Sequence, residues 1–281
     1  MSYALPIAET LSEAWLLGLE RTVLTGGREV HLIFTISEPG REVSAVRAVL
    51  DELLTTKGKA TTTTVAETIF PSSLYADPGF AWEPGLDADK EQRLDDAAAG
   101  LFDSYSSMLP LLLTASGNAS GTYFSRMMSW PGRTTTGTNQ VQLRIDGLRS
   151  QQSARRRTNN TLDIDVAADC LVGTEAMDGI QIYAPTDRRT RGFPCLTHLD
   201  FTLYQGRLHC TAVYRHHYLV EKAYGNFVGL SALMAFLAQQ SGYEIGELVV
   251  HATMADGQRS FADGAGLVTA ARAALGNEGS P

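Results

Sequence analysis

The segment LDFTLYQGRLHCTAVYR, residues 199–215, decides the class of fold of this chain. Apolar and polar residues alternate on both sides of Gln205-Gly206, so the segment predicts two paired strands joined by a tight turn. The next apolar segment, NFVGLSALMAFLAQQ at 226–240, is hydrophobic on nearly all sides and predicts a buried helix. A strand pair that leads into a buried helix indicates combined α and β structure.

The flanking sequence continues both patterns in mixed order. Helical spacing predicts helices at 10–24, 42–54, 91–113, 139–152 and 267–275, and alternation predicts strands at 29–36, 162–168 and 247–252. Residues 114–138 are rich in Ser, Gly, Asn, Thr and Pro and predict a long irregular loop, and residues 276–281 predict a frayed tail. No internal repeat and no linker divides the chain, so we expect one α+β domain over residues 1–281.

The composition argues against several classes of protein. The chain has 281 residues, 44% of them hydrophobic and 19% charged, which is enough apolar material for a core. The formal net charge of −8 argues against a broad basic face for a nucleic-acid polymer. Neither an apolar run of membrane-spanning length nor a secretory signal is recognised, so we expect a cytoplasmic protein that does not contact a membrane.

The three cysteines, Cys170, Cys195 and Cys210, fit reduced thiols better than a disulfide framework. Cys195 stands in Phe193-Pro194-Cys195, where the proline fixes the approach of the chain to the thiol just before a strand. An ordinary thiol with a pKa of about 8.5 is only about 3% ionised at pH 7, and a neighbouring guanidinium would raise that fraction. We expect Cys170 and Cys210 to be structural, and for Cys195 a core position is the alternative to a nucleophile.

Two other chemistries are open to the histidines. His209, His216 and His217, with His198 nearby, suggest a metal site, but strand alternation puts His216 and His217 on opposite faces and no ligand spacing supports it. Cys195 and His198 would make a thiol hydrolase pair, but three residues apart at a strand start is poor geometry for a general base. We therefore expect no metal and no hydrolytic pair.

Two further segments have alternative interpretations. The segment YFSRMMSW at 123–130 predicts either core packing or a flap or interface patch. The segment DGAG at 263–266 resembles a phosphate loop only weakly, and we expect a turn there.

Three motifs together resemble the thymidylate synthase superfamily: FPC with Cys195, LHCTAVYR ending in Arg215, and GNFVGLSALM with Asn226. In that family a Pro-Cys nucleophile leads into a strand, a second strand ends in an arginine that binds the nucleotide phosphate, and a buried helix opens with an asparagine that reads the pyrimidine. The resemblance implies these roles for Cys195, Arg215 and Asn226. It also implies a thymidylate-synthase-like domain with a mixed sheet, helices packed around the sheet, and a homodimer formed through the sheet.

Two less specific matches lie upstream. The segment SARRR at 153–157 resembles the family's phosphate motif, which reaches across the dimer, and this implies that Arg156 and Arg157 bind phosphate in the site of the other subunit. The segment VLDELL at 49–54 resembles the helix that carries the family's catalytic glutamate, which makes Glu52 the candidate.

The sequence also departs from the family. His216 stands where a serine helps to hold the phosphate, and Tyr218 stands where an aspartate contacts the folate. Asp256 and Gln258 stand near the positions that hold the sugar hydroxyl, and we expect Asp256 to accept from a 2′- or 3′-hydroxyl. Ile69-Phe70-Pro71 replaces the tryptophan-rich segment behind the folate. The pyrimidine half is kept better than the folate half, which argues against ordinary thymidylate synthesis.

The resemblance implies an enzyme that transfers a methyl or hydroxymethyl group to C5 of a uridine- or cytidine-type monophosphate. Cys195 would add to C6, Asn226 would contact O4 and N3–H, and Glu52 would hold a water at O4, with 5,10-methylenetetrahydrofolate as the carbon donor. The amide of Asn226 suits a uracil-type edge, while base, sugar and product stay open. The expected context is modified-nucleotide or nucleoside-antibiotic biosynthesis. The alternative is a nucleotide-binding member of the superfamily that has lost the folate reaction and uses another donor or none.

Overall fold

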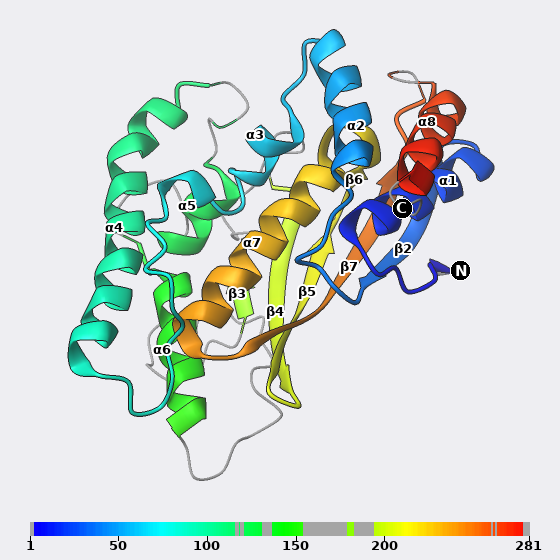
Figure 1. The fold of residues 1–281 in the computed structure, drawn as a ribbon. Helices are drawn as coiled ribbons and strands as arrows, with labels where there is room; N and C mark the ends of the chain where they lie inside the picture. Colours follow the sequence, from blue (N-terminus) through cyan, green and yellow to red (C-terminus); the bar gives the residue numbers. More distant parts are fainter. Residues whose placement is uncertain are drawn as a thin grey trace. The chain divides into compact units, whose positions relative to one another are not determined.

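A computed structural model describes residues 3–115, 118, 121–130, 137–153, 179–182, 194–259, 261 and 263–277 (Figure 1). The helices are α1 (Leu11–Leu24), α2 (Ser44–Thr56), α3 (Thr62–Ala66), α4 (Ala88–Leu112), α5 (Tyr123–Met128), α6 (Gln140–Ser153), α7 (Tyr224–Ser241) and α8 (Gly264–Asn277). The strands are β1 (Tyr3–Ala4), β2 (Arg28–Ile36), β3 (Gly179–Gln181), β4 (Leu196–Tyr204), β5 (Arg207–Tyr214), β6 (His217–Tyr218) and β7 (Glu244–Asp256). A short 3₁₀ turn, Ser72–Leu74, and a one-turn π-helix, Leu219–Ala223, complete the described elements. The α+β class is therefore confirmed.

The strands form a mixed sheet in the order β1-β2-β7-β5-β4-β3, and β6 pairs with β7 outside this path. The pairs β1–β2 and β6–β7 are parallel, whereas β2–β7 and β3–β4 are antiparallel. The tight turn expected between β4 and β5 is present, because Gln205 and Gly206 both have positive φ, at 51° and 79°. Two consecutive residues of this conformation are typical of a type I′ hairpin turn.

The described chain divides into two compact units, and each is built from separate segments. The first contains residues 1–69, 211–232 and 246–281, and the second contains residues 70–210 and 233–245. The elements β5, α7 and β7 each run from one unit into the other. That the whole of 1–281 is one domain stays a prediction.

The core of the first unit forms between β2 and the helices packed against it. Leu32, Phe34 and Ile36 alternate along β2 and are completely buried. Helix α1 packs against β2 and α8, and α8 also packs against α2. Gly18 of α1 allows this approach, because a Cβ at that position would lie 2.2 Å from the ring of Phe34. The Phe34 ring also packs edge-on against Phe227 of α7, at 5.3 Å between centroids.

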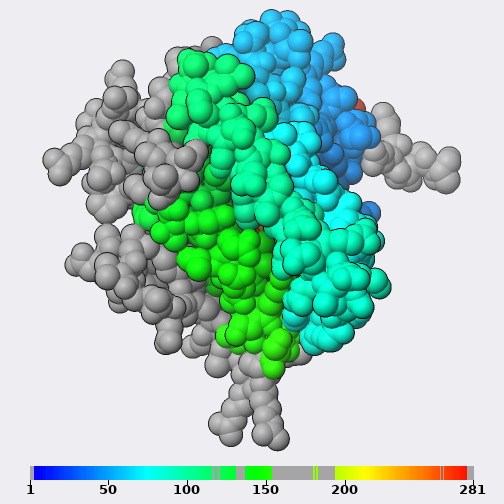
Figure 2. All heavy atoms as spheres, turned by 90° about the vertical axis from the view of Figure 1, so that its left-hand side faces the viewer, coloured from blue at the N-terminus to red at the C-terminus, as the bar shows by residue number. Residues whose placement is uncertain are grey.

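The second unit has a helical face and an aromatic core. Helices α4 and α6 lie side by side on the face seen in Figure 2, and Arg149 of α6 pairs with Asp95 of α4 at 2.7 Å. In the same unit the ring of Phe70 packs against those of Phe236 and Phe124, with centroids 5.1 and 5.9 Å apart. Phe70, Phe124 and Phe236 are all buried, so these rings form an aromatic part of the core of the unit.

The structure differs from the irregular loop predicted for 114–138, because α5 forms inside it. Thr122 caps this helix by accepting from the backbone N–H of Ser125 at 3.1 Å, and Phe124 and Met127 are completely buried. Tertiary burial therefore outweighs the loop-like composition, and of the alternatives for 123–130 core packing holds for those two residues. The strand predicted at 162–168 lies outside the described residues. No described helix combines the length and the apolar character needed to cross a membrane.

Candidate active site

Asn226 lies in the first turn of α7 and is the most informative of the predicted site residues. Its side chain is buried, at 3% exposure. The amide nitrogen Nδ2 lies 3.0 Å from Nε2 of His217, whereas the amide oxygen Oδ1 has no hydrogen-bond partner among the described residues. A buried acceptor without a partner is unusual in a folded protein, and Oδ1 of Asn226 is available to accept from a donor.

His217 contacts the amide nitrogen of Asn226 and is itself held by aromatic rings. It lies on β6, which pairs with β7 so that His217 is opposite Ala255. Its ring stacks on the ring of Tyr214 at 4.1 Å between centroids and 8° between planes, and Phe34 and Phe227 pack edge-on against it. Burial, helped by the charge of His216, lowers the pKa of His217 to about 3. The ring is therefore neutral at physiological pH.

Asp256 and His216, both predicted to bind substrate, are brought together. Oδ2 of Asp256 accepts from Nε of Arg28 at 2.9 Å and lies 3.5 Å from Nε2 of His216. Oδ1 of Asp256 accepts from the backbone N–H of Gln258 at 2.8 Å. The carboxylate is therefore anchored by hydrogen bonds from Arg28 and Gln258, with His216 nearby. Contact between Asp256 and a sugar hydroxyl stays a prediction.

Gln258 has a structural contact that the sequence did not reveal. Its Oε1 accepts from the backbone N–H groups of Val220 and Glu221, at 3.1 and 2.8 Å, and its Nε2 donates to the Glu221 carboxylate at 2.6 Å. These bonds secure the π-helix Leu219–Ala223, which leads directly into α7 and Asn226. No local pattern in the sequence signals this contact, because the partners are 37 and 38 residues apart.

The predicted phosphate ligands are only partly described. Arg215 is half-buried and directly follows β5, where the resemblance places it. Arg156 and Arg157 lie outside the described residues. Phosphate binding by these three arginines stays a prediction.

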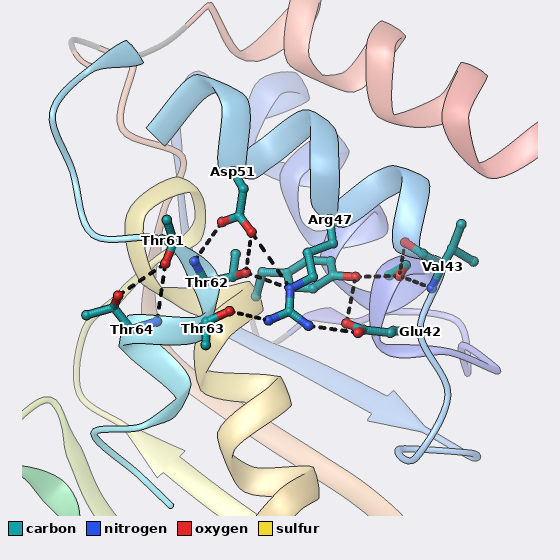
Figure 3. Close-up of polar contacts among 10 residues, drawn as sticks. Glu42, Val43, Arg47, Asp51, Thr61, Thr62, Thr63 and Thr64 are labelled. Carbon is teal, nitrogen blue, oxygen red and sulfur yellow. Dashed lines mark hydrogen bonds and ion pairs between the residues drawn. The ribbon is translucent and has the colours of Figure 1, made fainter. Parts of the chain in front are cut away.

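Glu52 is exposed on α2. Its neighbour in the sequence, Asp51, belongs to a network of polar contacts that anchors the helix (Figure 3). Asp51 accepts from the backbone N–H and the hydroxyl of Thr62, at 2.7 and 2.9 Å. Arg47 donates to the hydroxyls of Thr62 and Thr63, at 2.9 and 2.8 Å. The network ties α2 to the start of α3, and so it fixes the orientation of the helix that carries Glu52.

The same network continues to the start of α7. Arg47 also pairs with Glu42 at 2.8 Å, and Glu42 accepts from the hydroxyl of Tyr224 at 3.4 Å. The Tyr224 hydroxyl lies 2.7 Å from the hydroxyl of Ser12 in α1. Burial raises the pKa of Tyr224, so this phenol stays protonated and acts as a fixed link between α1, α2 and α7.

Cys195 lies in the second unit, half-buried and directly before β4, and it forms no disulfide with a described residue. The hydroxyl oxygen of Tyr123 accepts hydrogen bonds from the backbone N–H groups of Leu196 and Cys195. Burial first, and then the nearby Cys195 sulfur, raise the pKa of Tyr123. A protonated phenol therefore lies beside the proposed nucleophile. Sequence reasoning missed Tyr123, because it treated 123–130 only as core, flap or interface.

The other thiols and histidines show no comparable site. Cys210 is buried, and burial raises its thiol pKa, which is typical of an inert structural cysteine. Cys170 lies outside the described residues. Burial lowers the pKa of His198 to about 4. Among the described residues, no group of three or more His, Cys, Asp or Glu side chains could hold a metal ion.

Comparison with known proteins extends the resemblance to almost the whole chain. No protein-family model matches. The chain is 24% identical over 259 residues to a protein of Methanothermobacter marburgensis named "Putative thymidylate synthase". The aligned region covers 91% of this chain and 92% of that protein. A protein of the same name from Methanothermobacter thermautotrophicus is 34% identical over 71 residues, or 25% of this chain and 32% of that protein.

The full-length match and the α+β fold support the same conclusion as the Cys195, Arg215 and Asn226 motifs. This distant full-length similarity supports the thymidylate synthase superfamily, with the chain as a divergent member.

The positions that hold folate in this superfamily have changed character. Ile69 and Phe70, which replace the tryptophan-rich segment, are buried at 0% and 3% exposure and belong to the core. Tyr218, at the position of the folate-contacting aspartate, is an exposed aromatic residue without a carboxylate. The described residues at these positions therefore do not fit methylenetetrahydrofolate as the superfamily binds it.

Proposed function

We propose that this thymidylate-synthase-like chain is a transferase that modifies C5 of a pyrimidine nucleoside monophosphate through a covalent adduct between Cys195 and C6. The observation that carries the proposal is the buried Oδ1 of Asn226, which lacks a described partner at the position that resemblance assigns to base reading. Full-length similarity to a thymidylate-synthase-named protein and the spacing of Cys195, Arg215 and Asn226 support it. That Cys195 and Asn226 act on one nucleotide is part of the proposal.

The proposed chemistry begins with the thiolate. The Cys195 sulfur adds to C6, a C–S bond forms, and the electron pair of the C5–C6 bond moves to C5 and O4. C5 then bonds to an electrophilic carbon of the donor, and the bond that held this carbon to its carrier breaks and leaves its electron pair on the carrier. A base removes the C5 proton, the electron pair left at C5 restores the C5–C6 double bond, and the C–S bond breaks to release the thiolate. The Tyr123 phenol, beside the sulfur, is placed to hold or move a proton during these steps.

The nucleotide would be bound through its phosphate charge and through the polar edge of its base. Arg215, with Arg156 and Arg157 of the partner subunit, would bind the 5′-phosphate by charge-assisted hydrogen bonds. Asn226 would contact the base at N3 and the 4-position, and Glu52 would hold a water there. His216 and Asp256 would lie near the phosphate and the sugar.

The carbon donor is the open part of the proposal. Methylenetetrahydrofolate is the donor that the superfamily generally uses, but the described residues at the folate positions do not fit it. Methylation requires reduction of the transferred carbon, whereas hydroxymethylation requires addition of water. The buried Ile69 and Phe70 also favour a second candidate, a nucleotide-binding protein that lacks the folate reaction.

The first prediction tests the nucleophile without assuming any donor. UMP, dUMP, CMP and dCMP tritiated at C5 are incubated with the protein, and release of tritium to water is measured. We expect release from at least one nucleotide, because C6 addition makes the C5 proton exchangeable. Cys195→Ser is expected to slow release by about a thousandfold or more, while the dissociation constant changes less than about threefold.

Cys210→Ala is the matched control, because it removes a buried thiol that the mechanism does not use. It should keep both binding and exchange. Exchange that survives in Cys195→Ser would show that the nucleophile is wrong. Binding without exchange in the wild-type protein would favour the nucleotide-binding candidate.

A further inference from the structure

The contact between His217 and Asn226 leaves each side chain with one unsatisfied atom. Nδ2 of Asn226 and Nε2 of His217 are 3.0 Å apart. Oδ1 of Asn226 and Nδ1 of His217 are both buried and have no hydrogen-bond partner among the described residues. One hydrogen bond therefore joins the pair. Among the described residues, no second bond fixes the sense of this bond, that is, which of the two side chains donates.

The sense of this bond depends on where His217 carries its proton. In a neutral histidine one ring nitrogen donates and the other accepts, and the tautomer is normally set by a bond to the second nitrogen. Among the described residues, Nδ1 of His217 has no such bond, and the rings around it are those of Tyr214, Phe34 and Phe227. Its Nε2 can therefore accept from Nδ2 of Asn226, or donate to Oδ1 if the amide turns over.

The two pyrimidine bases differ in this same property. Uracil presents an N–H donor at N3 and a carbonyl acceptor at the 4-position, whereas cytosine presents an acceptor at N3 and an amino donor at the 4-position. An amide that reads both atoms must turn over to change from one base to the other. A neighbour of fixed sense would lose its hydrogen bond when the amide turned. His217 keeps the bond, because its tautomer can follow the amide.

We propose that the His217–Asn226 pair is an invertible reader, so that the site binds uracil-type and cytosine-type monophosphates alike. The inference rests on the proposed function, because it takes Asn226 as the residue that contacts the base. With uracil, Asn226 donates to His217, and Nδ1 of His217 carries the proton. With cytosine, Nε2 of His217 carries the proton and donates to Asn226.

Binding measurements give the first test. The dissociation constants of UMP and CMP, and of dUMP and dCMP, are measured with the full chain. We expect the two members of the pair with the preferred sugar to differ by less than about tenfold, whereas a reader of fixed sense discriminates by up to about a hundredfold. A ratio above about tenfold overturns the inference. The proposed function survives that result if the preferred nucleotide still exchanges its C5 proton.

The second test measures the tautomer of His217 in the wild-type protein. The nitrogen-15 shifts of its ring distinguish a protonated Nδ1 from a protonated Nε2, and the chain has only six histidines. The signal is assigned by its absence in His217→Gln. We expect the proton on Nδ1 in the complex with the uracil nucleotide and on Nε2 in the complex with the cytosine nucleotide. The same tautomer in both complexes overturns the inference.

Two substitutions at His217 complete the design. His217→Gln retains a side chain that can donate or accept, and it should bind both bases nearly as well as the wild type. His217→Leu removes the partner and should weaken both by a similar factor, about tenfold, with folding checked by circular dichroism. A loss confined to one base would show that His217 holds the amide in one sense only. Failure of all four nucleotides to bind the wild type would instead overturn the proposed function.

Discussion

The amide oxygen of Asn226 shows how one atom can indicate a ligand site. A buried acceptor without a donor costs about 1–3 kcal/mol of folding free energy. Asn226 is 3% exposed, and Nδ2 already contacts His217. A ligand that donates to Oδ1 would recover this cost on binding, so the arrangement favours recognition over stability.

Tyr123 is the residue for which we expect the clearest catalytic effect outside Cys195. Its hydroxyl accepts from the backbone at Cys195, and its raised pKa keeps the phenol protonated beside the sulfur. Tyr123→Phe is expected to slow tritium release by about tenfold to a hundredfold, because the proton carrier is lost, while nucleotide affinity stays nearly unchanged. Tyr75→Phe is the control, because the Tyr75 hydroxyl donates to Gln239 and accepts from Gln240, and neither glutamine belongs to the proposed site. Equal exchange rates in wild type and Tyr123→Phe would remove Tyr123 from the mechanism.

The low pKa of His217 predicts how stability depends on pH. The group titrates at about 3 in the folded chain and near 6.5 when unfolded, so the unfolded chain binds the proton more readily. Its contribution to stability is complete above pH 6.5 and is lost progressively from there down to about pH 3. At pH 5 the loss is about 2 kcal/mol.

Urea unfolding at pH 7 and pH 5 measures this loss. Burial of His198, with its pKa of about 4, adds to the same trend, so the comparison is made with His217→Leu, which keeps His198. The variant should lose less stability between the two pH values than the wild type. An identical loss in both proteins would contradict the assignment to His217.

The elements around the site are joined by side chains that bond to backbone. Gln258 binds the π-helix Leu219–Ala223, and Asp51 binds the start of α3. Both contacts supply an acceptor to N–H groups at the beginning of an element. The first N–H groups of a helix have no acceptor within the helix itself. They place the start of α7 and the orientation of α2, and so they position Asn226 and Glu52.

Gln258→Ala tests this support directly. It leaves the backbone N–H groups of Val220 and Glu221 without their acceptor, so the free energy of unfolding should fall by about 1–3 kcal/mol in urea titrations. Nucleotide affinity should fall with it, because Asn226 follows this turn. Gln92→Ala is the control: Gln92 bonds to Asp96 on an exposed part of α4, and its loss should change stability by less than about 0.5 kcal/mol. A similar small effect in both variants would contradict the role of Gln258.

For the molecule as a whole, the central proposal is a homodimer that shares its sites. The resemblance assigns Arg156 and Arg157 to the phosphate bound by the other subunit, and sedimentation should therefore show a dimer. Mixing Cys195→Ser chains with Arg156→Ala/Arg157→Ala chains under conditions of subunit exchange gives a sharper test. Heterodimers then carry one site with both defects and one intact site.

Tritium release should recover to about one quarter of the wild-type rate in an equal mixture, because half of the dimers are heterodimers and half of their sites are intact. Each variant alone should be nearly inactive. No recovery despite demonstrated exchange would place the arginines in their own subunit's site. A strictly monomeric protein would contradict the shared-site proposal.

Local patterns along the chain were sufficient to predict most elements. Alternation over 199–215 and the apolar segment at 226–240 predicted β4, β5 and α7 correctly, because periodicity depends on which face of an element is buried. The spacing of Cys195, Arg215 and Asn226 was sufficient to indicate the superfamily, since each motif is a short continuous segment and all three lie within residues 193–234. Helix α5 was missed, because its composition is that of a loop and only burial makes it helical.

Three features depended on contacts between distant segments. The bond between His217 and Asn226, the approach of Tyr123 to the backbone at Cys195, and the hold of Gln258 on Val220 and Glu221 follow no local period. Each depends on how strands and helices pack, and packing brings together side chains that are 9 to 72 residues apart in the numbering. The amino-acid order therefore specified the elements and the family, whereas tertiary packing determined which polar atoms are paired and which are left for a ligand.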